Sequence, residues 1–240
     1  MSTLGCMRTH LTRMVFVGVL GIVLASAALM MPQTSWADET KVEAETPESP
    51  VPNATYDESQ PGANDPRVKE GFAAYKAGDF KQAYDIWLPL AEAGNAEAQF
   101  RVGRLYDFGE GVQPDIELTI YWYQRSSTKM HLSGIYNLAF TLFWEDQYRD
   151  RNKGLQLFKR AAVLGHIKAQ QQYGIALAIM SENQDYSMAF KWLYISWVNG
   201  NESAIKPIEK LTIQSNNISR ANGIKMMREW FQTHPRISNN

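Results

Sequence analysis

Cysteine is nearly absent from this chain, which has one, Cys6, among 240 residues. That single residue excludes an internal disulfide framework and zinc sites built from two or four cysteines. Histidine is scarce as well, with 4 copies, and none of them lies in the HExxH pattern of zinc proteases. Neither sign of charge is in excess, since 24 Lys+Arg face 25 Asp+Glu. This balance argues against a nucleic-acid binder that relies on bulk electrostatic attraction.

Patterns that mark catalytic sites are also missing. Ser126, Ser127 and Ser133 have no GxSxG context, and nothing in the sequence points to a base that would activate them. The run Gly109-Glu110-Gly111 lacks the following glycine and the lysine of a phosphate-binding loop. We therefore expect no enzyme activity, no catalytic residue, no metal ligand and no cofactor.

The N-terminus has the order of a secretory signal, with a basic start, an apolar stretch and small residues before a cleavage point. Arg8 and Arg13 precede an uncharged run over residues 14–31, and small residues stand at −3 and −1 of a cut after Ala37. We expect residues 1–37 to be a signal peptide and the chain to be periplasmic or secreted. The alternative is an uncleaved inner-membrane anchor, because such a run could just span a bilayer. Membrane contact is expected through this segment alone.

Residues 38–66 are acidic and rich in proline. They hold eight acidic residues, one lysine and five prolines, with few large apolar side chains. Such a composition cannot bury enough surface to offset the entropy lost on ordering, so we expect a disordered linker. Residues 67–240 carry 21 Lys+Arg against 17 Asp+Glu. These opposite charges would attract the two parts weakly, but we expect the linker to act mainly as a solvated tether.

From Arg67 onward, apolar residues recur with helical spacing, and a longer repeat of 35 to 36 residues overlies them. The pattern predicts helix–turn–helix units that stack on one another, with glycine as a left-handed C-cap after the second helix. Three sets of equivalent positions carry it: Ala98, Gly134, Ala169 and Ala204 are small, Ala83, Thr119, Gly154 and Ala189 are small, and Trp87, Tyr123, Phe158 and Leu193 are bulky.

The repeat also sets the expected boundaries. The units cover 67–95, 96–130, 131–165 and 166–200, followed by closing helices over 201–232 and a tail over 233–240. The predicted helix pairs are 67–77 with 80–93, 96–107 with 115–128, 133–145 with 150–164, 167–181 with 185–199, and 202–213 with 217–232. Trp197 stands where the other units have a small residue, and we expect it to pack beneath the closing helices against Trp230 or Phe231.

Two histidines occupy equivalent positions in the repeat. His131 and His166 stand where the other units have Asn95 and Asn201. Both residue types can hydrogen-bond at a helix end, so a structural role explains all four positions. A metal site would need three or four converging ligands, which this pattern does not supply.

One stretch closely resembles a Sel1-like repeat: AEAQFRVGRLYDFGEGV over 96–112, then Pro114-Asp115 and Tyr121-Trp122-Tyr123. Later units keep parts of that pattern in register, the first unit looks more like a tetratricopeptide unit, and the turn over 144–152 departs from it because it has no GxGV. The resemblance covers 67–232. It implies an all-α, right-handed α-solenoid of stacked helix–turn–helix repeats with a concave face used for protein–protein interaction. Bacterial members of the family are often exported to the envelope.

The helix expected over 133–145 is the strongest candidate for a binding site, because it is apolar nearly all round. Its aromatic residues are spaced i, i+4, i+7 and i+8, so they share one face. An exposed aromatic group of that size would form an interaction patch, with polar residues of the preceding first helix as its rim. The alternative is that the irregular turn or a neighbouring helix covers it. The predicted protein-binding residues are Tyr136, Phe140, Phe143 and Trp144, with Arg101, Arg104 and Asp107 at the rim.

Three classes of function fit these observations. The first is an exported adaptor without chemistry of its own, which binds an envelope or periplasmic protein through the solenoid surface. An immunity protein that neutralises a periplasmic toxin is an alternative within that class. The second is a binder of cell-wall fragments or a hydrolase acting on them, which the missing catalytic pattern disfavours. The third is a structural homo-oligomer.

Overall fold

The computed structural model describes residues 57–146, 149–181 and 186–234, and these ranges contain ten α-helices and no strand. The expected signal segment, the linker up to residue 56 and the tail from residue 235 lie outside the described residues. None of the described helices is long and apolar enough to cross a membrane. The helices are α2 (Pro66–Lys76), α3 (Phe80–Glu92), α4 (Ala96–Phe108), α5 (Ile116–Thr128), α6 (Leu132–Trp144), α7 (Arg151–Val163), α8 (Ile167–Ile179), α9 (Ser187–Val198), α10 (Ile205–Gln214) and α11 (Asn217–Thr233).

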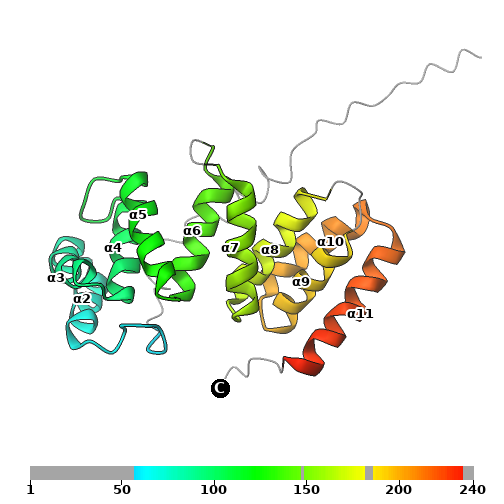
Figure 1. Cartoon of the computed structure of the whole chain (residues 1–240), viewed down its shortest axis with the longest axis horizontal. Helices are drawn as coiled ribbons and strands as arrows, with labels where there is room; N and C mark the ends of the chain where they lie inside the picture. Colours follow the sequence, from blue (N-terminus) through cyan, green and yellow to red (C-terminus); the bar gives the residue numbers. More distant parts are fainter. Residues whose placement is uncertain (1–56, 147–148, 182–185, 235–240) are drawn as a thin grey trace, which may run out of the picture. The chain divides into compact units, whose positions relative to one another are not determined.

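The helices pack in chain order as an α-solenoid (Figure 1). From α2 through α9, consecutive helices pack on one another, and α11 closes the series against α9. The predicted helix pairs are confirmed, with ends that agree within about three residues. The fifth pair begins differently, because a 3-10 turn over Glu202–Ala204 precedes α10.

The recurring small and bulky residues lie in the core, as the repeat predicts. The four bulky residues Trp87, Tyr123, Phe158 and Leu193 and every member of the two small sets are buried. Close approach explains why the small positions stay small. A Cβ atom added to Gly154 on α7 would lie 2.9 Å from Cβ of Phe143 on α6, so a larger residue would push the two helices apart.

The second helix of each unit ends in a left-handed residue. Gly94, Gly165 and Gly200 have φ angles of 95°, 94° and 95°, which glycine adopts without steric cost. In the second unit the equivalent residue is Met130, whose φ angle is 63°. Because a side chain in this region meets its own backbone, Met130 is the strained member of the set.

We expect Met130→Gly to raise the free energy of unfolding by about 1 kcal/mol, because it removes the left-handed penalty of an exposed residue. Urea unfolding of the parent and the variant measures the change. Gly165→Ala is the matched control and is expected to lower stability by a similar amount. A Met130→Gly variant that is less stable than the parent would contradict this account of the turn.

The boundary of the predicted linker was wrong, because residues 57–65 are folded onto the repeats. Glu97 N donates to Pro61 O at 3.0 Å and Asn95 Nδ2 to Gly62 O at 2.9 Å, both at the start of α4. Leu132 N, at the start of α6, donates to Gln60 Oε1 at 2.9 Å. Hydrogen bonds to polar groups at the starts of α4 and α6 thus stabilise the folded position of this segment. The segment can therefore be ordered although it buries little apolar surface. We call residues 57–65 the N-terminal strap.

Trp197 also differs from expectation, since it is 46% exposed on α9. The tryptophan that meets the closing helix is Trp192, whose ring centre lies 5.0 Å from that of Trp230. The two tryptophans are five positions apart on one helix and therefore point in different directions. The repeat pattern did not show that α11 packs on the face of α9 that carries Trp192.

Candidate protein-binding surface

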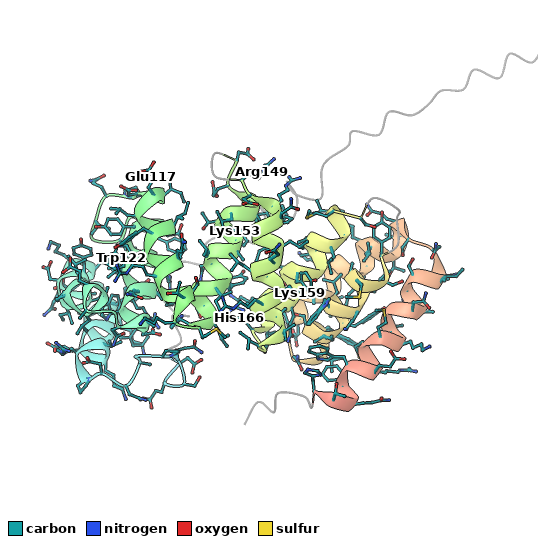
Figure 2. All side chains as sticks on the ribbon, in the orientation of Figure 1. Glu117, Trp122, Arg149, Lys153, Lys159 and His166 are labelled. Atoms are coloured by element: carbon teal, nitrogen blue, oxygen red, sulfur yellow. The ribbon has the colours of Figure 1, made fainter. Side chains whose placement is uncertain are left out.

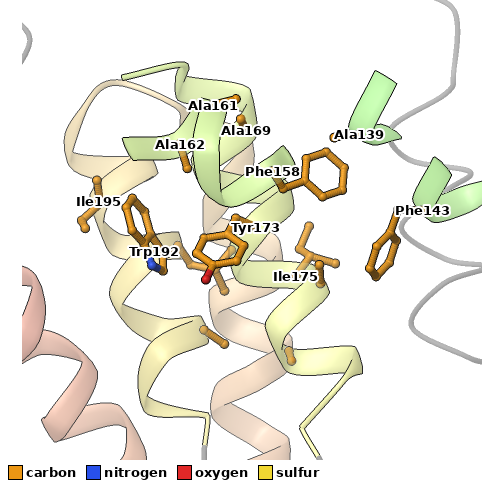
Figure 3. Packing of buried hydrophobic residues seen from close by; sticks show 14 of the residues in the cluster. Ala139, Phe143, Phe158, Ala161, Ala162, Ala169, Tyr173, Ile175, Trp192 and Ile195 are labelled. Atoms are coloured by element: carbon orange, nitrogen blue, oxygen red, sulfur yellow. The ribbon is translucent and has the colours of Figure 1, made fainter. Parts of the chain in front are cut away.

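Phe143 and Trp144 lie in the core, which corrects their predicted place on the surface. Phe143 is 0% and Trp144 is 3% exposed. The ring centre of Phe143 lies 5.8 Å from that of Phe158 on α7, and Figure 3 shows the two residues as neighbours. The physical reason is Gly154, whose missing side chain lets α7 cross directly over Phe143. The contact between Phe143 and Phe158 therefore stabilises the packing of α6 against α7 within one repeat.

Tyr136 and Phe140 lie at the margin of the same core and are half-buried. Tyr136 stacks on His166 at the start of α8, with ring centres 4.6 Å apart and planes 21° from parallel. Phe140 lies between Tyr136 and Trp144, at 6.2 and 6.3 Å. Burial raises the pKa of the Tyr136 hydroxyl, which therefore stays neutral. Of the four predicted aromatics, these two keep some surface that a partner could touch.

Arg101 is also buried, at 4% exposure, and is not part of a polar rim. Its Nε donates to Glu97 Oε1 at 2.5 Å, and its guanidinium lies 4.9 Å from the ring centre of Phe72. An aromatic environment of this kind stabilises a buried cation that already has a carboxylate partner. Arg101 therefore belongs to the structural core between α2 and α4.

Glu97 connects α4 to the start of α6. Its Oε2 lies 2.6 Å from Nε2 of His131, and both residues are buried. Nδ1 of His131 accepts a hydrogen bond from Gly134 N at 3.1 Å, so the ring proton is assigned to Nε2 and points at Glu97. Burial alone would raise the pKa of Glu97, but the hydrogen bond from His131 and the charge of Arg101 outweigh it, and the net shift is downward. We call Glu97, Arg101 and His131 the buried triad.

The predicted helix-end role is confirmed for three of the four equivalent residues. Asn95, His131 and His166 each accept a hydrogen bond from the backbone N–H three residues later, as N-caps do. Asn201 instead donates to Gln171 Oε1 at 2.9 Å. Within the described residues, no three His, Cys, Asp or Glu side chains form a group that could hold a metal ion.

The cap at His166 predicts a loss of stability in mild acid. Burial, with smaller electrostatic contributions from Lys168 and His131, lowers the pKa of His166 from 6.5 to about 4. Because the folded state binds the proton less well, stability is full above pH 6.5 and falls as the pH drops from 6.5 to 4, by about 3 kcal/mol in total.

A His166→Asn variant tests this, because asparagine keeps the cap, as Asn95 does, and does not titrate. We expect the parent to lose more stability than the variant between pH 7 and pH 5 in urea unfolding at each pH. Equal losses in the two proteins would show that His166 does not cause the change.

The remaining rim residues, Arg104 and Asp107, lie near the C-terminal end of α4, next to the exposed Phe108. Phe108 is 58% exposed, and the guanidinium of Arg104 lies 5.2 Å from its ring centre. Asp107 accepts a hydrogen bond from Tyr123 Oη at 2.9 Å and lies within electrostatic reach of Glu145, just after α6. We call Arg104, Asp107 and Phe108 the α4 surface.

Phe108 was missed by the sequence prediction. The motif aligns it with Trp144 of the next repeat, and the larger aromatic group on α6 looked like the better candidate. The signal that could have found it is its place directly before Gly109, where the chain turns away from the helix with a φ angle of 69°. A side chain in the last turn of a helix has fewer neighbours to cover it.

Comparisons with known proteins identify the repeat. A family model for the Sel1 repeat matches residues 96–129, 132–166 and 169–196. The chain carries three Sel1 repeats. They consist of α4 with α5, α6 with α7, and α8 with α9. The α4 surface therefore lies on the first helix of the first Sel1 repeat.

The chain is also similar to two solved structures. One is a protective antigen of uropathogenic Escherichia coli strains that displays an SLR fold, at 16% identity and a TM-score of 0.46. That match covers 69% of this chain and 45% of the antigen, so the chain spans less than half of the antigen's length. The other is a Sel1 repeat protein from Oxalobacter formigenes, at 18% identity and a TM-score of 0.44, with 81% of this chain and 94% of that protein covered. No curated protein matches the chain.

Proposed function

We propose that this protein is an exported adaptor that binds an envelope or periplasmic protein through its Sel1 repeats. Proteins with Sel1 repeats generally mediate protein–protein interactions. The observation that carries the proposal is the α4 surface, where Phe108 is exposed beside Arg104 and Asp107. Aromatic residues and arginine are the types that contribute most to binding at protein interfaces.

The arrangement of the α4 surface suits it to protein recognition. Phe108 offers apolar area, and the guanidinium of Arg104 is held close to its ring, so less side-chain entropy is lost when a partner binds. Asp107 is similarly fixed by Tyr123. Phe140 occupies the position in the second Sel1 repeat equivalent to Arg104 in the first, and its half-exposed ring would extend the contact.

Export is part of the same proposal and rests on the signal-like order of residues 1–37. We expect the protein from the envelope fraction to begin at Asp38. Mass spectrometry of its N-terminal peptide measures this directly. If the protein is found in the inner membrane with residues 1–37 still attached, cleavage after Ala37 is contradicted and the segment is a membrane anchor.

We expect Phe108→Ser with Phe140→Ser to reduce capture of the partner from an envelope extract at least about tenfold, because two apolar contacts are lost. Captured proteins are quantified by mass spectrometry. The matched control is Tyr121→Ser on α5, since Tyr121 is 46% exposed and also lies beside an arginine, with Arg125 Nη1 at 2.8 Å from its hydroxyl. All forms must have the same helicity and melting temperature. Equal capture by the parent and the double variant would place the site elsewhere.

A further inference from the structure

The first residue of the N-terminal strap, Asp57, lies close to the start of α6. Asp57 accepts hydrogen bonds from Ser59 and Gln60, and Gln60 accepts one from Leu132 N. Asp57 also lies within electrostatic reach of His131, the cap of α6. The described chain therefore begins at this point, where the first and second Sel1 repeats meet.

An exposed surface with apolar and basic side chains lies next to that point. Arg160 on α7 contacts the sulfur of Met130, which directly precedes His131. The first turn of α8 is close as well, because His166 lies within electrostatic reach of both His131 and Lys168. We call this surface the α7 edge; its exposed members are Met130, Arg160, Val163, Leu164 and Lys168.

The charge of the α7 edge is not neutralised locally. Helix α7 contains four basic residues and no acidic one, and Figure 2 marks Lys153 and Lys159 along it and His166 at the start of α8. Within the described ranges, no carboxylate lies within 4 Å of the charged groups of Arg160 or Lys168. The exposed Val163 and Leu164 lie between these two cations in the chain. A ligand for this surface would combine negative charge with a few apolar side chains.

We propose that residues 38–56 of the same chain dock on the α7 edge. This segment holds five acidic residues and one lysine, so its net charge is −4. Val51 and Tyr56 supply apolar side chains a few positions before Asp57 in the chain. The segment thus has the two properties that the α7 edge requires. The inference goes beyond the adaptor proposal, because it concerns another surface and needs no second protein.

Chain length and tethering favour docking within one molecule. The 19 residues from 38 to 56 could extend up to about 60 Å, far more than is needed to cross one repeat. Exposed ion pairs are individually weak. Attachment at Asp57, however, raises the local concentration of the segment to about the millimolar range, so several weak contacts suffice.

Site-specific photo-cross-linking in the full chain tests the proposal. Ser49 is replaced by the photoreactive amino acid benzoylphenylalanine, which leaves the acidic residues and Val51 unchanged. After irradiation in cells, cross-linked peptides are mapped by mass spectrometry. We expect links from position 49 to the peptides that contain Met130 or Val163–Leu164, in protein that migrates as a monomer. Links to other helices, links only in a dimer band, or no internal link would overturn the proposal.

A charge exchange provides the control. Arg160→Glu with Lys168→Glu is expected to lower the yield of these links about fivefold or more, because attraction becomes repulsion. Adding Glu43→Lys, Glu45→Lys and Glu48→Lys should restore the yield. Two reversals elsewhere, Lys76→Glu on α2 and Lys225→Glu on α11, should leave it unchanged. If the edge reversals have no effect in variants with parental melting temperature, charge complementarity does not hold the segment and the proposal fails.

Discussion

Glu97→Gln is expected to lower the free energy of unfolding by about 3 kcal/mol or more. The substitution leaves the guanidinium of Arg101 buried without the carboxylate that faces it at 2.5 Å. Removal of one member of a buried ion pair costs several kcal/mol, because the remaining charge stays out of water. Glutamine keeps an oxygen that can accept the proton of His131 Nε2, so the loss reports mainly on charge. Urea unfolding at pH 7 measures it.

The double variant Glu97→Gln with Arg101→Met separates charge from shape. Methionine fills the space among the aromatic rings without a charge, and apolar replacement of a buried ion pair is often nearly neutral. We therefore expect the double variant to be more stable than Glu97→Gln alone. If Glu97→Gln costs less than about 1 kcal/mol, or if Arg101→Met adds a further loss, the buried triad does not contribute as described.

Phe143→Ala is expected to cost about 4 kcal/mol, because it opens a cavity between α6 and α7 in a fully buried site. The companion variant Phe140→Ala should cost less, since Phe140 is half-buried and partly hydrated in the folded state. The difference in unfolding free energy between the two variants measures how much more the buried Phe143 contributes to stability than the half-buried Phe140. Equal costs would contradict the assignment of Phe143 to the core.

This result also decides how binding variants should be built. A variant that changes Phe143 or Trp144 lowers stability and can lose a partner only because it unfolds. Phe108 and Phe140 avoid that difficulty, because neither is fully buried. The α4 surface and Phe140 can therefore be tested without a large loss of stability.

The repeat architecture could be predicted from the sequence because it depends on local periodicity. Helical spacing placed α4 over 96–107 and the structure has Ala96–Phe108, and Asn95 was predicted to act at a helix end. Positions such as Gly154 and Phe158 recur at a fixed period, so each copy supports the assignment of the others. Units whose own pattern is weak could therefore still be assigned from their register with the other units.

The surface could not be predicted in the same way, because exposure depends on which helix covers which face. Periodicity placed Tyr136, Phe140, Phe143 and Trp144 on one face of α6, but it did not show that α7 closes over half of that face. Gly154 carried the missing signal, since a small residue there permits the close crossing. Likewise, composition predicted disorder through residue 66 and missed the hydrogen bonds that hold the N-terminal strap.

The dissociation constant of the captured partner for three forms of the protein tests the central claim most directly. The forms are the parent, Phe108→Ser and Tyr121→Ser, compared at matched melting temperature. The account predicts that Phe108→Ser raises the dissociation constant about tenfold or more, while Tyr121→Ser leaves it unchanged. A partner that binds all three forms equally, or one that is lost only with Tyr121→Ser, would contradict recognition through the α4 surface.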